Sequence, residues 1–151
     1  MSTQNVRIEQ LGDDMVDETI HLLNTIMSSK QSTQFYRRVI RQNPTLQLAA
    51  VLKQKVIGAL ICRKSEDRVE IIALAVKAVY RHQGIGSSLI QILFHRVTQL
   101  DVTIIDLYIH ATNNDTLRFY QSVGFKEMEL IDKYYREKDS SAVHMIYETK
   151  R

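Results

Sequence analysis

The sequence predicts an α/β domain in which a mixed sheet is covered by helices on both faces. Two observations carry this prediction. Strand-like and helical segments follow one another in the order strand, two helices, three strands, helix, strand, helix, two strands. The 151 residues contain one proline, no repeat and no linker rich in proline, glycine or serine. One domain is therefore expected to span residues 1–151.

The first half of the chain supplies four strands and two helices. Asp13 and Asp14 place negative charge before a helix with apolar residues at helical spacing up to Met27. A second helix is expected to end before Pro44. The expected strands are residues 6–11, 46–52, 56–64 and 68–77, and the expected second helix is residues 33–41. Residues 53–55 should join two of these strands as an antiparallel hairpin.

The second half continues with alternating elements. Gly84 opens a helix through residue 99, with apolar side chains at helical spacing. A short helix over residues 113–123 is expected to end at Gly124, because glycine favours the left-handed conformation found after helices. The strands of this half are residues 102–110, 125–131 and 142–147.

Composition excludes several classes of function. Hydrophobic residues make up 44% and charged residues 25%, as in soluble globular proteins. The net charge of +3 comes from scattered basic residues, which does not favour nucleic-acid binding. No apolar run reaches the roughly 20 residues that span a bilayer, and the first ten residues lack the pattern of a signal peptide. We therefore expect a cytosolic or nuclear protein without nucleic-acid or membrane partners.

Cys62 is the only cysteine, so neither an internal disulfide nor a thiolate-rich metal site is expected. It lies in an apolar run, which predicts a small core residue. His21, His82, His95 and His144 show no ligand-like spacing, so no metal is expected.

A candidate anion site follows the strand over residues 68–77. Gly84 and Gly86 stand at the expected start of a helix, where backbone amides lack intrahelical partners and glycine allows close approach. Arg81 adds a permanent positive charge. The pattern is neither a Walker loop nor a Rossmann fingerprint. By itself it is also compatible with tight packing, and its context favours a pyrophosphate site.

Two motifs resemble known signatures. Residues 81–86, Arg-His-Gln-Gly-Ile-Gly, resemble the Arg/Gln-x-x-Gly-x-Gly/Ala acetyl-CoA motif of the GNAT superfamily. Residues 113–127 resemble its second signature, an Asn-led helix that carries Phe-Tyr and ends in Gly-Phe. Within the superfamily the chain is most similar to the N-alpha-acetyltransferase 50 type, through residues 79–81, 106–108, 119–120 and 132–136. The resemblance implies a GNAT fold, with a mostly antiparallel sheet splayed in the middle, and acetyl-CoA as cofactor.

The resemblance also implies how acetyl-CoA is held. The backbone of residues 74–76 should pair with the pantetheine arm as an added strand does, and amides of residues 82–88 should hold the pyrophosphate. Asn113 and Tyr120 should lie near the thioester. The expected cofactor residues are Leu74, Ala75, Val76, Arg81, His82, Gln83, Gly84, Ile85, Gly86, Ser87, Ser88, Asn113 and Tyr120.

Catalytic candidates come from strand alternation. It is expected to place Glu70, Ile72, Leu74 and Val76 on one face of their strand, and Asp106, Tyr108 and His110 on one face of theirs. Glu70 lies where histone acetyltransferases of this superfamily carry their glutamate and is the candidate general base. The alternative is a carboxylate in an ion pair with Arg68 or a neighbouring strand. The N-alpha-acetyltransferase 50 type has tyrosine at position 70 and histidine at position 108.

Tyr120 is the candidate general acid for the departing thiolate, and Tyr108 is a candidate for orienting substrate or water. The acceptor decides how much a base is needed. At pH 7, neutralising an α-amine of pKa ~7.9 costs about 1.2 kcal/mol, and neutralising lysine of pKa ~10.4 costs about 4.6 kcal/mol.

The acceptor side is predicted to include two segments. Met27, Ser29 and Gln31 occupy the loop expected to hold the first substrate residues, and Tyr134 and Tyr135 stand where the resemblance implies a peptide-binding hairpin. Ile72 and His110 are further candidates. The leading interpretation is acetylation of a protein or peptide N-terminus. Lysine or small-amine acetylation, and a weakly active subunit that binds other acetyltransferase subunits, are the alternatives.

Overall fold

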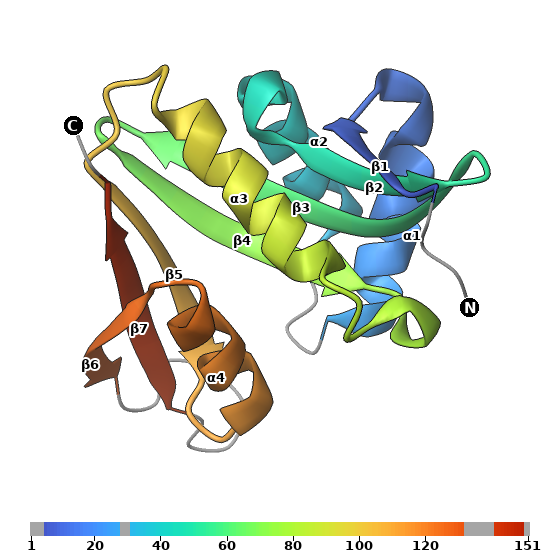
Figure 1. Cartoon of the computed structure of the whole chain (residues 1–151). Helices are drawn as coiled ribbons and strands as arrows, with labels where there is room; N and C mark the ends of the chain where they lie inside the picture. The colour runs from blue at the N-terminus through green and yellow to red at the C-terminus, as the bar shows by residue number, and fades with distance from the viewer. Residues whose placement is uncertain (1–4, 28–30, 132–140, 150–151) are drawn as a thin grey trace.

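The computed structural model describes residues 5–27, 31–131 and 141–149, and every helix and strand predicted within these ranges is present (Figure 1). Cys62 is fully buried, as predicted. In chain order the elements are β1 (Arg7–Gln10), η1 (Asp13–Met15), α1 (Val16–Ile26), α2 (Thr33–Gln42), η2 (Pro44–Leu46), β2 (Leu48–Leu52), β3 (Lys55–Ser65), β4 (Arg68–Val76), η3 (Ala78–Tyr80), α3 (Ile85–Val97), β5 (Ile104–His110), α4 (Asn114–Ser122), β6 (Lys126–Ile131) and β7 (Ala142–Glu148).

The boundaries follow from local chemistry. Pro44 ends α2 as predicted and opens the short helix η2, so β2 begins two residues later than expected. Lys53 and Gln54 form a two-residue hairpin turn with φ of 51° and 65°, as the right-handed twist of the flanking strands requires. Gly124 has φ of 109° just beyond α4, which confirms its predicted place after the helix.

Seven strands of the described residues form one sheet in the order β1-β2-β3-β4-β5-β7-β6. Only β4 and β5 pair in parallel, and their pairing covers three residue pairs, from Arg68–Ile104 to Glu70–Asp106. Beyond Glu70 the two strands diverge, so the sheet opens into two halves (Figure 1). The predicted sheet, mostly antiparallel and splayed in the middle, is confirmed.

The helices cover both faces, as predicted. Apolar residues of α3 and α4 form one core with the sheet, and apolar residues of α1 and α2 form a second core on the opposite face. Figure 1 shows α3 across the near face, with α1 and α2 behind the sheet. None of the helices in the described ranges is long and apolar enough to cross a membrane.

A β-bulge interrupts the pairing of β3 with β4. Ile61 lies opposite Ala73, yet the next residue, Cys62, lies opposite Ile71. Ile72 is therefore an extra residue in β4. One extra residue reverses which face the following side chains point to.

The bulge corrects one sequence prediction. Glu70 and Ile72 lie on the α1 and α2 face, whereas Leu74 and Val76 pack against the core under α3. The prediction that all four share one face was wrong, because alternation holds only up to the bulge. The buried residues of β4 switch in the same way: Val69 and Ile71 lie under α3, and Ala73 and Ala75 lie under α1 and α2. The side chains of β4 before and after the bulge that were expected to line one cleft thus lie on opposite faces of the sheet.

Candidate active site

The turn between η3 and α3 is shaped to hold an anion. His82 has φ of 62° and Gly84 has φ of 84°, and α3 begins at the next residue. Left-handed residues at a helix start turn successive backbone N–H groups toward one side, and the helix dipole adds partial positive charge. The first turn of α3 carries no acidic residue that would repel an anion.

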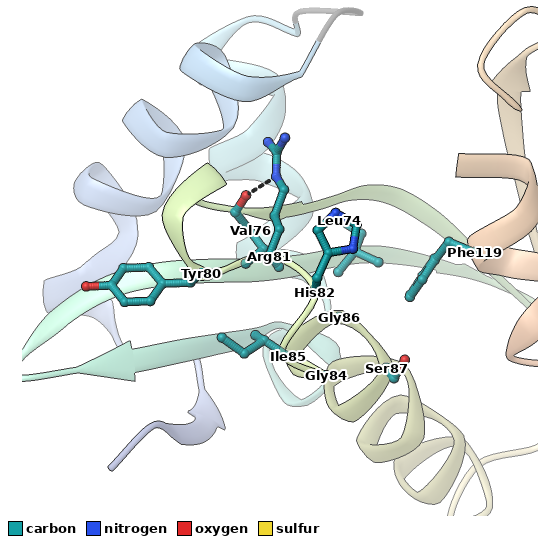
Figure 2. Close-up of a pocket in the computed structure, with 10 residues that line it drawn as sticks. All are labelled: Leu74, Val76, Tyr80, Arg81, His82, Gly84, Ile85, Gly86, Ser87 and Phe119. Carbon is teal, nitrogen blue, oxygen red and sulfur yellow. Dashed lines mark hydrogen bonds between the residues drawn. The ribbon is translucent and has the colours of Figure 1, made fainter. Parts of the chain in front are cut away.

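A pocket of about 280 Å³ opens directly from this turn (Figure 2). Leu74 and Val76 of β4 and Tyr80 of η3 contribute to its walls, and Phe119 of α4 faces them from across the gap. The pocket lies along the part of β4 beyond Glu70, where β4 no longer pairs with β5. The pocket therefore joins an anion-binding turn to an open strand edge.

Arg81 lies at the edge of this pocket. Its Nε donates a hydrogen bond to the backbone oxygen of Val76 at 2.9 Å, as Figure 2 shows. This bond ties the side chain to the end of β4, and in Figure 2 the guanidinium points away from Gly84 and Ser87.

Most of the predicted cofactor residues line the pocket: Leu74, Val76, Arg81, His82, Gly84, Ile85, Gly86 and Ser87. The side chain of Ala75 points into the core under α1 and α2, which leaves only its backbone toward the gap. Gln83, Ser88, Asn113 and Tyr120 are not part of the lining. Sequence reasoning missed Tyr80 and Phe119 as lining residues, although Phe119 stands in the Phe-Tyr pair of the second motif.

Asn113 and Tyr120 sit at the two ends of α4. The Oδ1 of Asn113 accepts a hydrogen bond from the N–H of Thr116 at 3.2 Å, so Asn113 caps the helix. Tyr120 is 5% exposed, and its ring meets those of Phe119 and Phe125 edge to face at 5.1 and 5.3 Å. Burial raises the pKa of Tyr120, so its phenol keeps its proton at neutral pH.

The opposite face of the opening carries a cluster of charged side chains. Arg63 donates to Oε1 of Glu70 at 2.8 Å, and Arg68 donates to Oδ2 of Asp106 at 3.1 Å. His144 of β7 also contacts Oδ2 of Asp106 through Nε2, at 2.8 Å. No sequence pattern indicates the Asp106–His144 contact, since the two residues are 38 positions apart. Only the pairing of β5 with β7 brings them together.

Tyr108 lies in the same cluster. Its ring stacks on His144 with centroids 4.5 Å apart and planes 11° apart. Burial raises the pKa of Tyr108, the charge of Asp106 raises it further, and Arg68 opposes both. Asp106, Tyr108 and His110 share this face as predicted, because the alternating residues Ile105, Leu107 and Ile109 belong to the other core.

The remaining acceptor-side predictions are only partly covered by the structure. Met27 caps the end of α1 and packs, with Ile72, against the core under α1 and α2. Gln31 is exposed at the start of the segment that leads into α2. Ser29, Tyr134 and Tyr135 lie outside the described residues. Within the described ranges no three His, Cys, Asp or Glu side chains are grouped so that they could hold a metal ion.

Comparison with known proteins decides the family. The sequence model of the Acetyltransferase (GNAT) family matches residues 10–125, well over half of the chain. The chain belongs to the GNAT family. This confirms the superfamily predicted from the two motifs.

Curated relatives of this GNAT chain are N-alpha-acetyltransferases. Human N-alpha-acetyltransferase 30 is 28% identical over 123 residues, which cover 78% of this chain and 34% of the human protein. The chain thus spans about a third of that relative. N-alpha-acetyltransferase 50 of Danio rerio is 27% identical over 154 residues, covering 96% of this chain and 90% of the relative. The predicted similarity to the N-alpha-acetyltransferase 50 type is confirmed.

Solved structures agree on the fold. Ard1 from Thermoplasma volcanium superposes with a TM-score of 0.89 at 19% identity, covering 97% of this chain and 99% of that chain. Arabidopsis thaliana Naa50, in complex with the bisubstrate analogue CoA-Ac-MVNAL, superposes with a TM-score of 0.83 at 22% identity, covering 94% and 97%.

Proposed function

We propose that this GNAT protein transfers the acetyl group of acetyl-CoA to a primary amine, the α-amine of a protein or peptide N-terminus. One observation carries the proposal: the anion-binding turn leads along the open edge of β4 to the point where β4 and β5 part. A phosphate-bearing cofactor with a long arm fits such a path. The N-alpha-acetyltransferase relatives support the α-amine as acceptor.

The residues present fit coenzyme A. The N–H groups of the turn and of the first residues of α3 would hold the pyrophosphate, and Arg81 adds a positive charge to the same turn. Gly86 lines the pocket, and an added Cβ there would lie 3.3 Å from Phe119, so glycine keeps the passage wide. Backbone groups of Leu74, Ala75 and Val76 would bind the pantetheine arm from the unpaired side of β4.

Acetyl-CoA supplies an acetyl group activated as a thioester, and this chain supplies the surroundings. Tyr120 keeps its proton and is suited to donate a hydrogen bond to the departing sulfur. Full proton transfer is uphill, because a phenol of pKa ~10 is a weaker acid than a thiol of pKa ~8.5. Tyr120 therefore acts chiefly by stabilising negative charge on sulfur.

The acceptor amine enters from the face of α1 and α2. Tyr108 stands on this face, just past the last β4–β5 pair, and orients the amine or a water. The ion pair of Glu70 with Arg63 favours a supporting role for Glu70 rather than that of general base. An α-amine needs only about 1.2 kcal/mol to lose its proton at pH 7, so water suffices to take up that proton.

The acceptor backbone is proposed to lie beside the end of α1, on the face that carries Ile72. Met27 and Ile72 pack on this side, and Gln31 and His110 stay predicted acceptor residues, as do Ser29, Tyr134 and Tyr135, which lie outside the described residues. We further propose a cytosolic or nuclear location, since the lone buried Cys62 suits a reducing compartment. Association with other acetyltransferase subunits stays a prediction. In the described parts of α1 and α2 no large apolar side chain is exposed.

A peptide panel tests the proposal. Acetylation is measured by mass spectrometry on three peptides: a free N-terminus without lysine, the same with lysine, and a blocked N-terminus with lysine. We expect one acetyl group on each free N-terminus and none on the blocked peptide. Acetylation of the blocked peptide alone would establish the lysine acceptor. Binding of acetyl-CoA without turnover of any peptide would contradict the proposal.

A further inference from the structure

Three strands carry a row of polar side chains across the acceptor face. The registers place Tyr108 of β5 directly opposite His144 of β7, and His144 directly opposite Glu129 of β6. Asp106 stands two residues before Tyr108 on the same face. The row begins at the last β4–β5 pair and borders the gap into which we place the acceptor amine.

Asp106 is the unusual member of this row. It is 1% exposed, and among the described residues its Oδ1 has no hydrogen-bond partner. Burying a carboxylate costs several kcal/mol, and a well-packed apolar residue at such a position is often as stable or more so. A buried carboxylate is therefore best explained by what it orients. Its other oxygen, Oδ2, is shared by Arg68 and His144.

The imidazole ring of His144 is hydrogen-bonded at one edge and stacked against another ring on one face. Its Nε2 lies 2.8 Å from Oδ2 of Asp106, and its Nδ1 lies 3.7 Å from Oε1 of Glu129. The ring plane is nearly parallel to that of Tyr108. A hydrogen bond that fixes the imidazole therefore also fixes the phenol stacked upon it.

We propose that His144, oriented by Asp106, is a positioning residue that holds the phenol of Tyr108 at the entrance for the acceptor amine. The proposal rests on the proposed acetyl transfer and extends it to residues that do not touch the substrate. Positioning matters because a displacement of about 1 Å lowers the rate of an oriented reaction by up to about 100-fold.

His144→Gln is the main variant. Glutamine keeps a side-chain N–H for Asp106 and removes the ring under Tyr108. We expect kcat/KM for the peptide to fall about 10-fold or more, while KM for acetyl-CoA and the melting temperature stay near wild type. His95→Gln is the matched control, because His95 is exposed on α3, on the other face of the sheet. It should leave all three quantities unchanged.

A double-mutant cycle separates positioning from a general structural role. If His144 acts through the Tyr108 hydroxyl, His144→Gln should change the rate less than about 3-fold in a Tyr108→Phe background. An equal loss of rate in both backgrounds overturns the proposal. So does His144→Gln with wild-type kinetics.

A readout without turnover keeps this inference separate from the proposed function. In protein with ¹³C-labelled tyrosine rings, the signals of Tyr108 are those that Tyr108→Phe removes. His144→Gln should shift them, because the stacked imidazole imposes a ring current, and His95→Gln should not. Unmoved signals refute the positioning itself. If the signals shift but the wild-type protein acetylates no amine, the proposed function fails and the positioning stands.

Discussion

At the residue scale, Tyr120 shows how burial selects a role. Its ring is enclosed by aromatic neighbours, and burial raises the pKa of its phenol. A phenol in such surroundings releases its proton poorly and so remains available as a hydrogen-bond donor. Tyr120 is thus suited to stabilise a developing thiolate and unsuited to act as a base at neutral pH.

Removing this hydroxyl should slow turnover without unfolding the protein. Tyr120→Phe is expected to lower kcat about 100-fold, as loss of one preorganised donor does elsewhere, with little change in KM for acetyl-CoA. In the wild type the Tyr120 phenol stays neutral up to at least pH 9.5, because its pKa lies above the ordinary value of ~10. Steady-state kinetics from pH 6.5 to 9.5 check both points. A variant with wild-type kcat would contradict the assignment.

The role that we assign to the Glu70 carboxylate follows from its ion pair with Arg63. It is 15% exposed and ion-paired with Arg63, whose side chain is 42% exposed. Glu70→Gln is expected to lower the free energy of unfolding by about 0.5–1 kcal/mol, since a half-exposed partner limits the strength of the pair. The pH–rate profile for an N-terminal acceptor should keep its shape. Loss of the acidic limb of that profile would instead identify Glu70 as the general base.

The candidate site was predictable from sequence where residues are neighbours along the chain. The turn from Arg81 to Ser87 is one segment, so its glycines and its position before a helix are visible in the sequence. The face of Glu70 was not, because an extra residue in β4 shows only in its pairing with β3. The contact of Asp106 with His144 depends on strand register, which local patterns do not encode.

At the element scale, the start of α3 uses two glycines for different reasons. Gly84 has φ of 84° and space around an added Cβ, so its constraint is backbone conformation. An added Cβ on Gly86 would approach Cζ of Phe119 to 3.3 Å, so its constraint is room in the pocket.

Alanine at Gly84 should therefore lower stability, whereas alanine at Gly86 should lower the affinity for acetyl-CoA. Gly84→Ala is expected to lower the free energy of unfolding by about 1–2 kcal/mol, the cost of left-handed backbone for a residue with a Cβ. Gly86→Ala should keep or raise stability, because alanine is a better helix former by about 1 kcal/mol, yet weaken acetyl-CoA binding about 10-fold.

Chemical unfolding and isothermal titration calorimetry measure these two quantities. Gln91→Ala, at an exposed position of α3, serves as the control for both. Equal effects of the two glycine variants on binding and on stability would contradict this division of roles.

The elements themselves were largely predictable, since each has a clear periodicity or turn signal. Helix α3 was expected over residues 84–99 and ends at Val97. Strand β5 was expected from residue 102 and starts at Ile104. The shift at the start of β2, also of two residues, arose because Pro44 opens a short helix.

At the scale of the whole molecule, the parted sheet links fold to function. The two halves of the sheet are joined by strand pairing at only three β4–β5 residue pairs. Beyond these pairs, the pocket lies on one face of the opening and the acceptor-side cluster lies on the other. A ligand that lies along the edge of β4 and reaches toward Phe119 contacts both halves. The cofactor should therefore stabilise their relative placement as well as the turn.

This bridging gives a prediction for hydrogen exchange. Acetyl-CoA at saturation should slow exchange of amides in the turn before α3, along the edge of β4 from residue 71, and in α4. Adenosine 3′,5′-bisphosphate carries phosphates but no pantetheine arm, so at equal saturation it should slow exchange at the start of α3 only. Each ligand slows exchange because it binds the native state and not the opened one. The two ligands are therefore compared at the same fractional occupancy. Hydrogen–deuterium exchange with mass spectrometry measures the three segments separately. Equal protection of α4 by both ligands would mean that the gap is closed by the turn alone and not by the arm.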